Sequence, residues 1–390
     1  MSDAAPGPLI FLTACEPSGD DLGARIMAAL KAKTGGRVRF SGLGGEEMTA
    51  QGLVSLFPMS ELSVMGIAEI LPHIPNVFRR IYDTAAAIRR LRPDLVLTID
   101  SQAFSFGVAK RVTRCGIPLV HLNAPKVWVF RPRRARRVAR YYDHLLALLP
   151  FEPPYFEAVG LPCTCIGHPV VESGADRGDG RAFRRRYGIP AEAPVLCVLP
   201  GSRRSEIKYL LDIFNGVVRL MAARVPGLHL VTATVPAVAP PVSAAAARWP
   251  APSVVVEGRE DKFHGFAASD VALAASGTVS LELALAQVPM VIAYRIAALT
   301  AAVAGPFVHA RFASIVNLIE DRAVIPEFLQ GACRSEALAD AVAALMEDEA
   351  ARRTQVEGCA EVLRRLGLGG QPPSERAAEI VLELVEAGRR

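Results

Sequence analysis

The cysteines of this sequence form neither a disulfide framework nor a metal site. No two of the seven are spaced as a CxxC pair, and none lies at a zinc-ligand spacing from a histidine. An odd number of cysteines in apolar, strand-like surroundings is typical of reduced, buried thiols in a cytoplasmic protein. This pattern excludes a small disulfide-stabilised secreted domain and argues against a structural zinc site.

The sequence also has no uninterrupted apolar run long enough to span a membrane. Its most apolar later stretch, residues 288–308, is broken by Arg295, Gly305 and Pro306. The first residues, MSDAAPGP, lack the basic head and apolar core of a secretory signal. We therefore expect a cytoplasmic chain that is soluble or lies on a membrane surface.

Excess charge is modest overall and concentrated in one stretch. The net charge is only +5, yet residues 131–140, RPRRARRVAR, contain six arginines. A solvated helix face is the ordinary explanation for such a run, and contact with an anionic membrane surface is the alternative. Aromatic ladders and nucleic-acid motifs are missing, so we expect no nucleic-acid partner.

What the sequence does have is a regular alternation of strand-like and helix-like stretches. The 390 residues, 51% of them hydrophobic, suffice for two globular domains of about 150 to 200 residues each. Amphipathic helices such as 77–91 lie between apolar runs. The alternation predicts an α/β protein with two Rossmann-like, doubly wound parallel sheets. The strand-like runs are 9–15, 38–43, 95–100, 118–123 and 144–150, then 195–201, 229–235, 253–258, 271–276 and 290–295.

The predicted domains cover residues 1–170 and 190–345, and Ala-rich helices in 346–390 are expected to pack back across the junction. Both domains open with a strand, a turn containing Pro, Gly and Ser, and a helix. Ligands bind outside the carboxyl ends of strands in open α/β sheets, so both openings should face a cleft between the domains. The first opening, EPSGD, lacks GxGxxG spacing, which excludes a dinucleotide-dependent dehydrogenase.

The second opening predicts an anion site at Gly201, Ser202 and Arg203. It combines free backbone N–H groups, the positive end of a helix dipole and a guanidinium group, which together suit a phosphate or diphosphate. Ser202 is expected to cap the helix that follows. A plain strand-to-helix turn with solvated arginines is the alternative.

A second anion loop is predicted at Ser276, Gly277 and Thr278, after the strand-like run 271–276. Glu282 lies four residues beyond Thr278, on the same helix face, where a carboxylate could accept both hydroxyls of a ribose. A surface glutamate that stabilises the helix dipole is the alternative. Two anion loops in one domain favour a nucleotide diphosphate as the ligand.

In the first domain, Asp100 is the best candidate for a general base, because it ends a rigid strand beside the expected cleft. A structural role as a helix cap or ion-pair partner is the alternative. Glu16 ends the first strand, and Ser18 with Asp21 could form a loose capping box at the helix that follows. Trp128, beside the arginine run, fits either core packing or an interfacial patch.

Taken in order along nearly the whole chain, a set of motifs resembles the lipid-A-disaccharide synthases, glycosyltransferases of the GT-B fold. The resemblance implies a cofactor-free, metal-independent, inverting transfer. The 2,3-diacylglucosamine of UDP-2,3-diacylglucosamine would pass to the 6-hydroxyl of 2,3-diacylglucosamine 1-phosphate, releasing UDP. The matching motifs are EPSGD (16–20), SVMGIAEIL (63–71), VWVFRPRRARR (127–137), ALLPFEP (147–153), IGHP (166–169), LPGSRRSEI (199–207), ASGTVSLELAL (275–285), PMVIAYR (289–295), NL (317–318) with PEFLQ (326–330), and PSERAAE (373–379).

The resemblance also implies roles for individual residues. Arg203 and the 276–278 loop would lie near the diphosphate, Glu282 near the ribose and Asn317 near the nucleotide sugar. Glu16 and Asp100 match acidic positions of the acceptor domain, where they are the catalytic candidates. Further substrate contacts are expected at Ser18, Gly19 and Met65. The enzyme would lie on the inner face of the bacterial inner membrane, with residues 131–140 toward anionic lipid, and a homodimer is left open.

One position departs from the family pattern. The family reads IDxPDF, and its second Asp is a leading candidate for the general base, whereas this chain reads IDSQAF with Ala103 at that place. Asp100 or Glu16 would then have to act as the base. The alternatives are a homologue that binds UDP-sugar or glycolipid without turnover, and another GT-B enzyme acting on a UDP-sugar.

Overall fold

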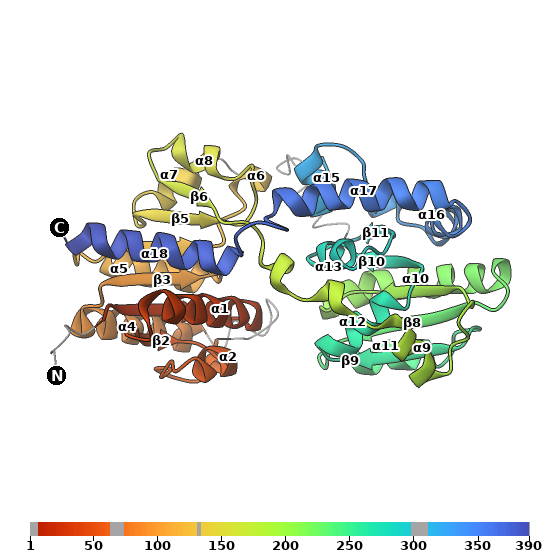
Figure 1. The fold of residues 1–390 in the computed structure, drawn as a ribbon, viewed down its shortest axis with the longest axis horizontal. Coiled ribbons are helices and arrows are strands. Elements are labelled where there is room, and N and C mark those ends of the chain that lie inside the picture. The colour runs from red at the N-terminus through yellow and green to blue at the C-terminus, as the bar shows by residue number, and fades with distance from the viewer. Residues whose placement is uncertain (1–6, 63–73, 131–133, 298–310, 390) are drawn as a thin grey trace. The chain divides into compact units, whose positions relative to one another are not determined.

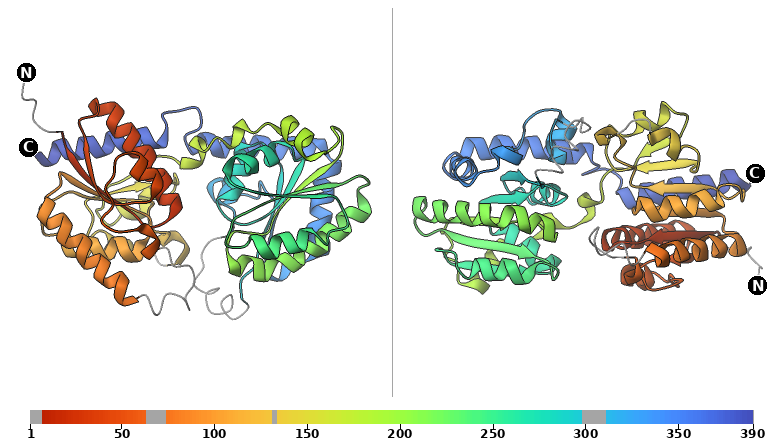
Figure 2. Two further views of the ribbon diagram at one scale, coloured as in Figure 1. Left: turned by 90° about the horizontal axis from the view of Figure 1, so that it is seen from below. Right: turned by 180° about the vertical axis from the view of Figure 1, so that it is seen from behind.

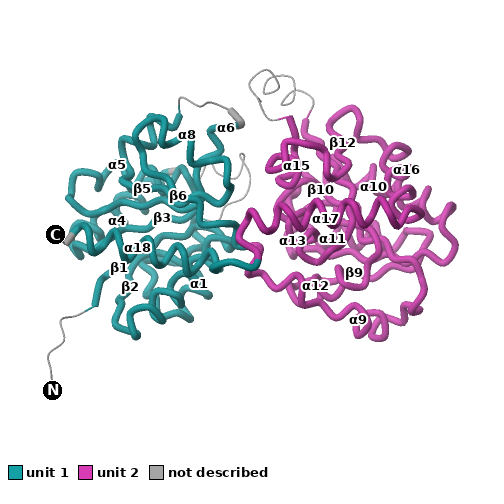
Figure 3. The backbone as a smooth tube through the Cα atoms, turned by 45° about the horizontal axis from the view of Figure 1, so that its top comes forward, with its two compact units in different colours: residues 1–169, 369–390 teal, residues 170–368 magenta. Residues whose placement is uncertain are grey.

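A computed structural model describes residues 7–62, 74–130, 134–297 and 311–389. The chain forms two compact units, one of residues 1–169 with 369–390 and the other of residues 170–368 (Figure 3). The segment 346–390, expected as one group of helices, is divided between them. Its helix α17 (Glu349–Arg365) belongs to unit 2, and its helix α18 (Pro373–Arg389) belongs to unit 1.

Unit 1 is built on a parallel sheet whose six strands lie in the order β2-β1-β3-β4-β5-β6. Successive side chains of a strand point to opposite faces, and both faces are covered by helices, which explains the continuous apolar runs. On β1, Ile10 and Leu12 join one core while Phe11 joins the other. The strands are β1 (Leu9–Ala14), β2 (Arg39–Leu43), β3 (Leu95–Ile99), β4 (Leu119–Leu122), β5 (His144–Ala147) and β6 (Cys163–Cys165).

Helices α1 and α18 pack against each other over one face of this sheet, although they come from opposite ends of the chain (Figures 1 and 2). The buried residues Ala377, Val381 and Val385 bring α18 into the same core as α1. The other core includes residues of α4 and α5. The helices are α1 (Pro17–Thr34), α2 (Glu46–Ala50), α4 (Ile74–Leu91), α5 (Gln102–Val112), α6 (Val127–Phe130), α7 (Ala135–Val138) and α8 (Pro153–Glu157), with a 3-10 turn at Met59–Glu61.

Unit 2 has a second six-stranded parallel sheet, in the order β12-β11-β10-β7-β8-β9. Its strands are β7 (Val195–Leu199), β8 (His229–Thr234), β9 (Ser253–Glu257), β10 (Val271–Ala275), β11 (Met290–Tyr294) and β12 (Glu327–Leu329). Its remaining helices are α9 (Gly180–Tyr187), α10 (Arg204–Arg224), α11 (Ala239–Ala246), α12 (Arg259–Ala267), α13 (Val279–Leu285), α15 (Ile315–Glu320) and α16 (Ser335–Glu347), with 3-10 turns at Pro169–Glu172, Ala175–Arg177 and Gln330–Ala332.

The predicted fold class, two doubly wound parallel sheets, is confirmed. In each sheet the strand order reverses direction once, between β1 and β3 in unit 1 and between β7 and β10 in unit 2. Helices that follow strands on either side of such a point lie on opposite faces of the sheet, which leaves a crevice at the carboxyl ends of the strands. The sites predicted from the sequence follow these four strands.

Candidate functional site

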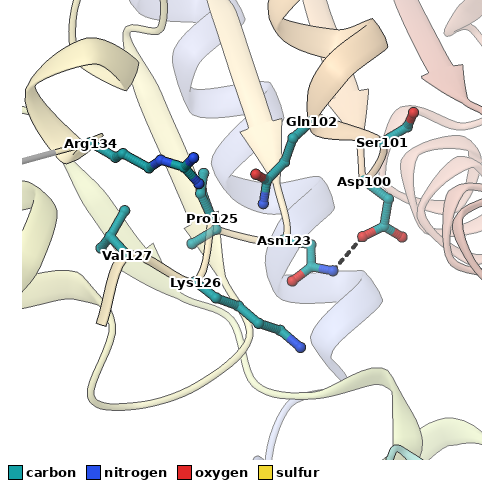
Figure 4. Close-up of a pocket in the computed structure, with 9 residues that line it drawn as sticks. Asp100, Ser101, Gln102, Asn123, Pro125, Lys126, Val127 and Arg134 are labelled. Carbon is teal, nitrogen blue, oxygen red and sulfur yellow. Dashed lines mark hydrogen bonds between the residues drawn. The ribbon is translucent and has the colours of Figure 1, made fainter. Parts of the chain in front are cut away.

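Asp100 and Asn123 meet at the carboxyl edge of the first sheet. Asp100 follows β3 with φ 51°, and Asn123 follows β4 with φ 74°. Asp and Asn tolerate this left-handed conformation better than most residues. The Asn123 side-chain amide donates a hydrogen bond to Asp100 Oδ1 (Figure 4), and the Asp100 N–H donates to the Leu122 carbonyl at 3.2 Å. The carboxylate is therefore held at the edge of the sheet by both its side chain and its backbone.

The Asp100 carboxylate lines a cavity of about 270 Å³. Lys126 and Arg134 place two cationic side chains on the same cavity (Figure 4). A pocket that combines a carboxylate with two cations can bind a phosphorylated ligand and receive a proton from it. The remaining lining residues are Ser101, Gln102, Asn123, Ala124, Pro125 and Val127.

The first opening contributes to the same site. A Cβ atom on Gly19 would lie in ordinary van der Waals contact, 3.5 Å from Asp100 Oδ2 and 3.4 Å from Ile99 Cγ2, so the start of α1 lies beside this carboxylate. Burial raises the pKa of Asp100, and the negative charge of Glu16 raises it further, while the hydrogen bond from Asn123 lowers it. The structure thus brings the predicted residues Glu16, Gly19 and Asp100 together.

Within EPSGD, Asp20 is the residue that anchors a neighbouring helix, and the sequence patterns did not single it out. Glu16 and Ser18 are exposed, and helix α1 begins at Pro17 without a side-chain cap, so the capping box expected at Ser18 is wrong. Asp20 is buried and accepts hydrogen bonds from the N–H groups of Gly45, Glu47 and Met48 at 2.7, 3.0 and 3.1 Å. Asp20 therefore fixes the start of α2 against α1.

Glu152 is a second residue that the sequence patterns missed. Its carboxylate is buried and accepts hydrogen bonds from Trp128 Nε1 at 3.2 Å and from the Leu149 N–H at 3.1 Å. Burial raises its pKa to about 7, against the lowering effects of these hydrogen bonds and of Lys126. Trp128 also contacts the Phe151 ring edge-on, at 5.2 Å between centroids. Its indole is thus anchored to the protein, one residue after the cavity-lining Val127.

In unit 2, the loop after β7 holds its own carboxylate. Glu206 Oε2 accepts hydrogen bonds from the N–H groups of Ser202 and Arg203 at 2.9 and 3.1 Å. The expected free N–H groups are therefore already used, and Ser202 does not cap the helix, whose N-cap residue is Arg203. Gly201 has φ 123°, and a Cβ there would lie 2.5 Å from Glu206 Oε2. The Arg203 guanidinium is paired with Glu206 Oε1 at 3.2 Å, although the Arg203 side chain is 71% exposed.

The loop after β10 is more open. Gly277 and Thr278 are exposed, while the Ser276 hydroxyl donates a hydrogen bond to the Ala313 carbonyl at 3.0 Å. Glu282 lies one turn into α13, as the spacing predicts, but both of its carboxylate oxygens are 2.9 Å from Lys262 Nζ. Glu282 is therefore one partner of a half-buried ion pair and not a plain surface glutamate.

Asn317 is fully occupied by its own unit. Its Nδ2 donates to the Ile325 carbonyl at 2.8 Å and to Glu327 Oε1 at 2.7 Å. Its Oδ1 accepts from the N–H groups of Val324 and Ile325 at 2.8 and 2.9 Å. Glu327 in turn accepts from the N–H groups of Ala313 and Ser314. The side chain expected near the nucleotide sugar is therefore hydrogen-bonded within unit 2, and it is connected to the 313–314 loop through Glu327.

Met65 and residues 131–133 lie outside the described residues. Within the rest of the arginine run, Ala135–Val138 form α7, where Ala135 and Val138 are buried, and the arginines of residues 134–140 are exposed. This is the arrangement expected of a solvated helix face. It leaves the arginines available to a partner of negative charge.

A profile of the lipid-A-disaccharide synthetase family matches residues 10–381. The chain belongs to this family. A lipid-A-disaccharide synthase of Rhodospirillum centenum is 54% identical over 379 residues, covering 97% of this chain and 94% of the relative. One of Paramagnetospirillum magneticum is 49% identical over 385 residues, covering 98% of each. The predicted family, the glycosyltransferase class and the function of lipid-A-disaccharide synthase are thereby confirmed.

Solved structures confirm the GT-B fold of this family member. A UDP-GlcNAc 2-epimerase from Neisseria meningitidis, bound to UDP-GlcNAc, superposes with a TM-score of 0.64 at 14% identity, covering 97% of this chain and 99% of the epimerase. MurG from Acinetobacter baumannii gives a TM-score of 0.57 at 15% identity, covering 98% of this chain and all of MurG. At these identities the likeness concerns the fold alone.

Proposed function

We propose that this chain transfers 2,3-diacylglucosamine from UDP-2,3-diacylglucosamine to the 6-hydroxyl of 2,3-diacylglucosamine 1-phosphate, as a step of lipid A biosynthesis. The observation that carries the proposal is the Asp100 cavity, in a chain that matches the family profile over residues 10–381. A carboxylate with a raised pKa lies there beside two cations, at the carboxyl ends of β3 and β4.

In this proposal Asp100 is the general base. It removes the proton from the acceptor 6-hydroxyl as that oxygen attacks the anomeric carbon of the donor sugar. The bond from this carbon to the diphosphate breaks on the opposite side, which inverts the configuration and releases UDP. A raised pKa makes the Asp100 carboxylate a stronger base. The hydrogen bond from the Asn123 amide orients this carboxylate.

The two cations of the cavity would bind the phosphate group of the acceptor. Lys126 and Arg134 line the cavity together with Asp100, and an acceptor that carries a phosphate at its 1-position offers them an anion. In unit 2, the exposed guanidinium of Arg203 and the N–H groups of Gly277 and Thr278 would stabilise the charge of the departing UDP.

Ala103 does not stand in the way of this assignment. It is exposed in the first turn of α5 and is not among the residues that line the cavity, whereas its neighbours Ser101 and Gln102 are. The carboxylate that the cavity does contain belongs to Asp100. This favours an active enzyme over a homologue that only binds its ligands.

Exposed apolar side chains support binding to a membrane surface. On α4, Phe78 is 52% and Tyr82 58% exposed, one helical turn apart, and the same helix carries exposed arginines at positions 79, 89 and 90. Aromatic side chains beside cations suit the boundary between lipid headgroups and acyl chains. Within the described ranges, no helix combines the length and apolarity needed to cross a bilayer. We propose peripheral binding to the inner face of the inner membrane.

The proposal is tested by mass-spectrometric detection of the disaccharide, with both lipid substrates in detergent and a chelator present. Wild type and Ala103→Asp should both form product, and Asp100→Asn should be slower by roughly 10²- to 10⁴-fold because it lacks the base. UDP binding without product in wild type would instead indicate a binding protein. Turnover of water-soluble UDP-GlcNAc would indicate another GT-B enzyme, and an unimpaired Asp100→Asn would place the base elsewhere.

A further inference from the structure

Lys262 faces the carboxylate that is proposed to bind a ribose. Its Nζ is 2.9 Å from both Oε1 and Oε2 of Glu282, and the two side chains are only 25% and 19% exposed. Lys262 lies on α12, after β9, while Glu282 lies on α13, after β10. These strands are separated in the sheet by β7 and β8. The ion pair therefore joins two helices that the sheet does not make neighbours.

Two aromatic rings lie near the ammonium group of Lys262. Its Nζ is 4.9 Å from the ring centroid of Phe263 and 6.0 Å from that of Phe266, and both rings are buried. Contacts with aromatic faces favour a cation that has left bulk water. The turn Ala175–Arg177 also touches both α12 and α13. Within the described residues, no side chain other than Lys262 is recorded as a partner of the Glu282 carboxylate.

The hydrogen-bonding capacity of Glu282 matches what a ribose offers. An ionised carboxylate has about four acceptor positions, roughly two on each oxygen. Lys262 occupies one position on each oxygen and thereby fixes the rotation of the carboxylate. One position on each oxygen is left, and the 2′- and 3′-hydroxyls of a ribose supply two adjacent donors. A deoxyribose supplies only one.

We propose that Lys262 is a positioning residue that makes the site selective for ribonucleotides over deoxyribonucleotides, by holding the Glu282 carboxylate in the orientation that accepts both hydroxyls. This inference rests on the proposed function, because it takes UDP to be the bound nucleotide. Lys262 itself does not have to touch the nucleotide.

The test compares the affinities of the full chain for UDP and for 2′-deoxy-UDP by titration calorimetry. Wild type should prefer UDP by roughly 10- to 100-fold, since the analogue lacks one hydrogen bond to a charged acceptor. Lys262→Met should lower this preference below about threefold while changing the affinity for 2′-deoxy-UDP little. Lys262→Arg should keep most of the preference, because a guanidinium also engages both oxygens. Arg224→Met, which breaks the surface pair with Asp340, is the charge-matched control and should keep all of it.

Each preference is a ratio of two affinities measured on one variant, so partial unfolding of that variant cancels. An equal loss of both affinities in Lys262→Met would overturn the inference and show a contact with the phosphates or a purely structural role. An unchanged preference in Lys262→Met or Glu282→Gln would overturn it as well. If wild type binds UDP but shows no preference, the selectivity fails while the proposed function stands. If wild type binds neither nucleotide, both fail.

Discussion

Asn317 shows how one side chain can control a loop that it does not belong to. All four of its hydrogen-bonding positions are used within unit 2, and its partner Glu327 holds the N–H groups of Ala313 and Ser314. The Ala313 carbonyl accepts the hydroxyl of Ser276. The loop predicted to bind the diphosphate is thus connected to a buried amide about forty residues further along the chain.

Replacing this amide should be costly. Asn317→Ala leaves two backbone N–H groups and a half-buried carboxylate short of partners, so we expect unfolding to become easier by about 3 kcal/mol. Asn215→Ala is the matched control, because that amide accepts a single bond, from Trp249 Nε1 at 2.8 Å, and should cost about 1 kcal/mol. Urea unfolding of both variants measures the difference. Equal losses would show that the Asn317 network adds nothing beyond one hydrogen bond.

At the scale of an element, Asp20 joins two helices of unit 1. Its carboxylate lies on α1 and accepts three N–H groups at the start of α2. Gly19 precedes Asp20 in the same turn of α1, and Glu16 is the N-cap residue of this helix, beside Asp100. A variant that breaks the contacts between Asp20 and α2 therefore loosens this turn of α1, while Glu16 and Asp100 stay unchanged.

We expect Asp20→Ala to destabilise unit 1 by about 2 kcal/mol, the upper end of the range for a lost helix cap. Hydrogen exchange should accelerate at the amides of Gly45, Glu47 and Met48. Asp179→Ala serves as the comparison, because Asp179 caps α9 as an ordinary N-cap residue, with a hydrogen bond from the Ala182 N–H at 2.8 Å, and its loss should cost about 1 kcal/mol. Unchanged exchange at these three amides would refute the capping role.

The sequence predicted the ten longer strands, and with them the strand ends where Glu16, Asp100 and the two anion loops lie. Apolar runs of this length are a strong local signal. The edge strands β6 and β12 were missed because each has only three residues. The partners of the site residues were also missed. Lys262 lies 20 positions from Glu282 and Asn123 23 positions from Asp100, so only the folded sheet brings them together.

At the scale of the molecule, burial of histidines makes unit 1 sensitive to acid. Burial lowers the pKa of His121 to about 3, and burial together with Lys126 lowers that of His168 to about 4. An unfolded histidine has a pKa of about 6.5. As the pH falls below that value, the unfolded chain binds protons that the folded unit excludes, so stability decreases.

Glu152 acts in the opposite direction, because its raised pKa of about 7 lets the folded state bind a proton first as the pH falls. His144, whose pKa burial also lowers, adds to the effect of the two histidines, and Asp100, whose pKa burial raises, adds to that of Glu152. We expect a net loss of about 2 kcal/mol between pH 6.5 and 5, which corresponds to roughly one proton over that interval. Urea unfolding at the two pH values measures this loss. His121→Phe should remove most of it, since phenylalanine does not titrate. A pH dependence equal to that of wild type would contradict this account.

The packing of α18 on α1 has a consequence for the order of synthesis. Unit 2 lies within the sequence of unit 1, so the ribosome completes all of unit 2 before it makes residues 373–389. Until then, one apolar face of the first sheet lacks part of its cover, because Ala377, Val381 and Val385 are not yet present. Unit 1 is therefore begun first and completed last. While unit 2 folds, the uncovered apolar face of the first sheet has to be shielded from aggregation, either by other parts of the nascent chain or by a chaperone.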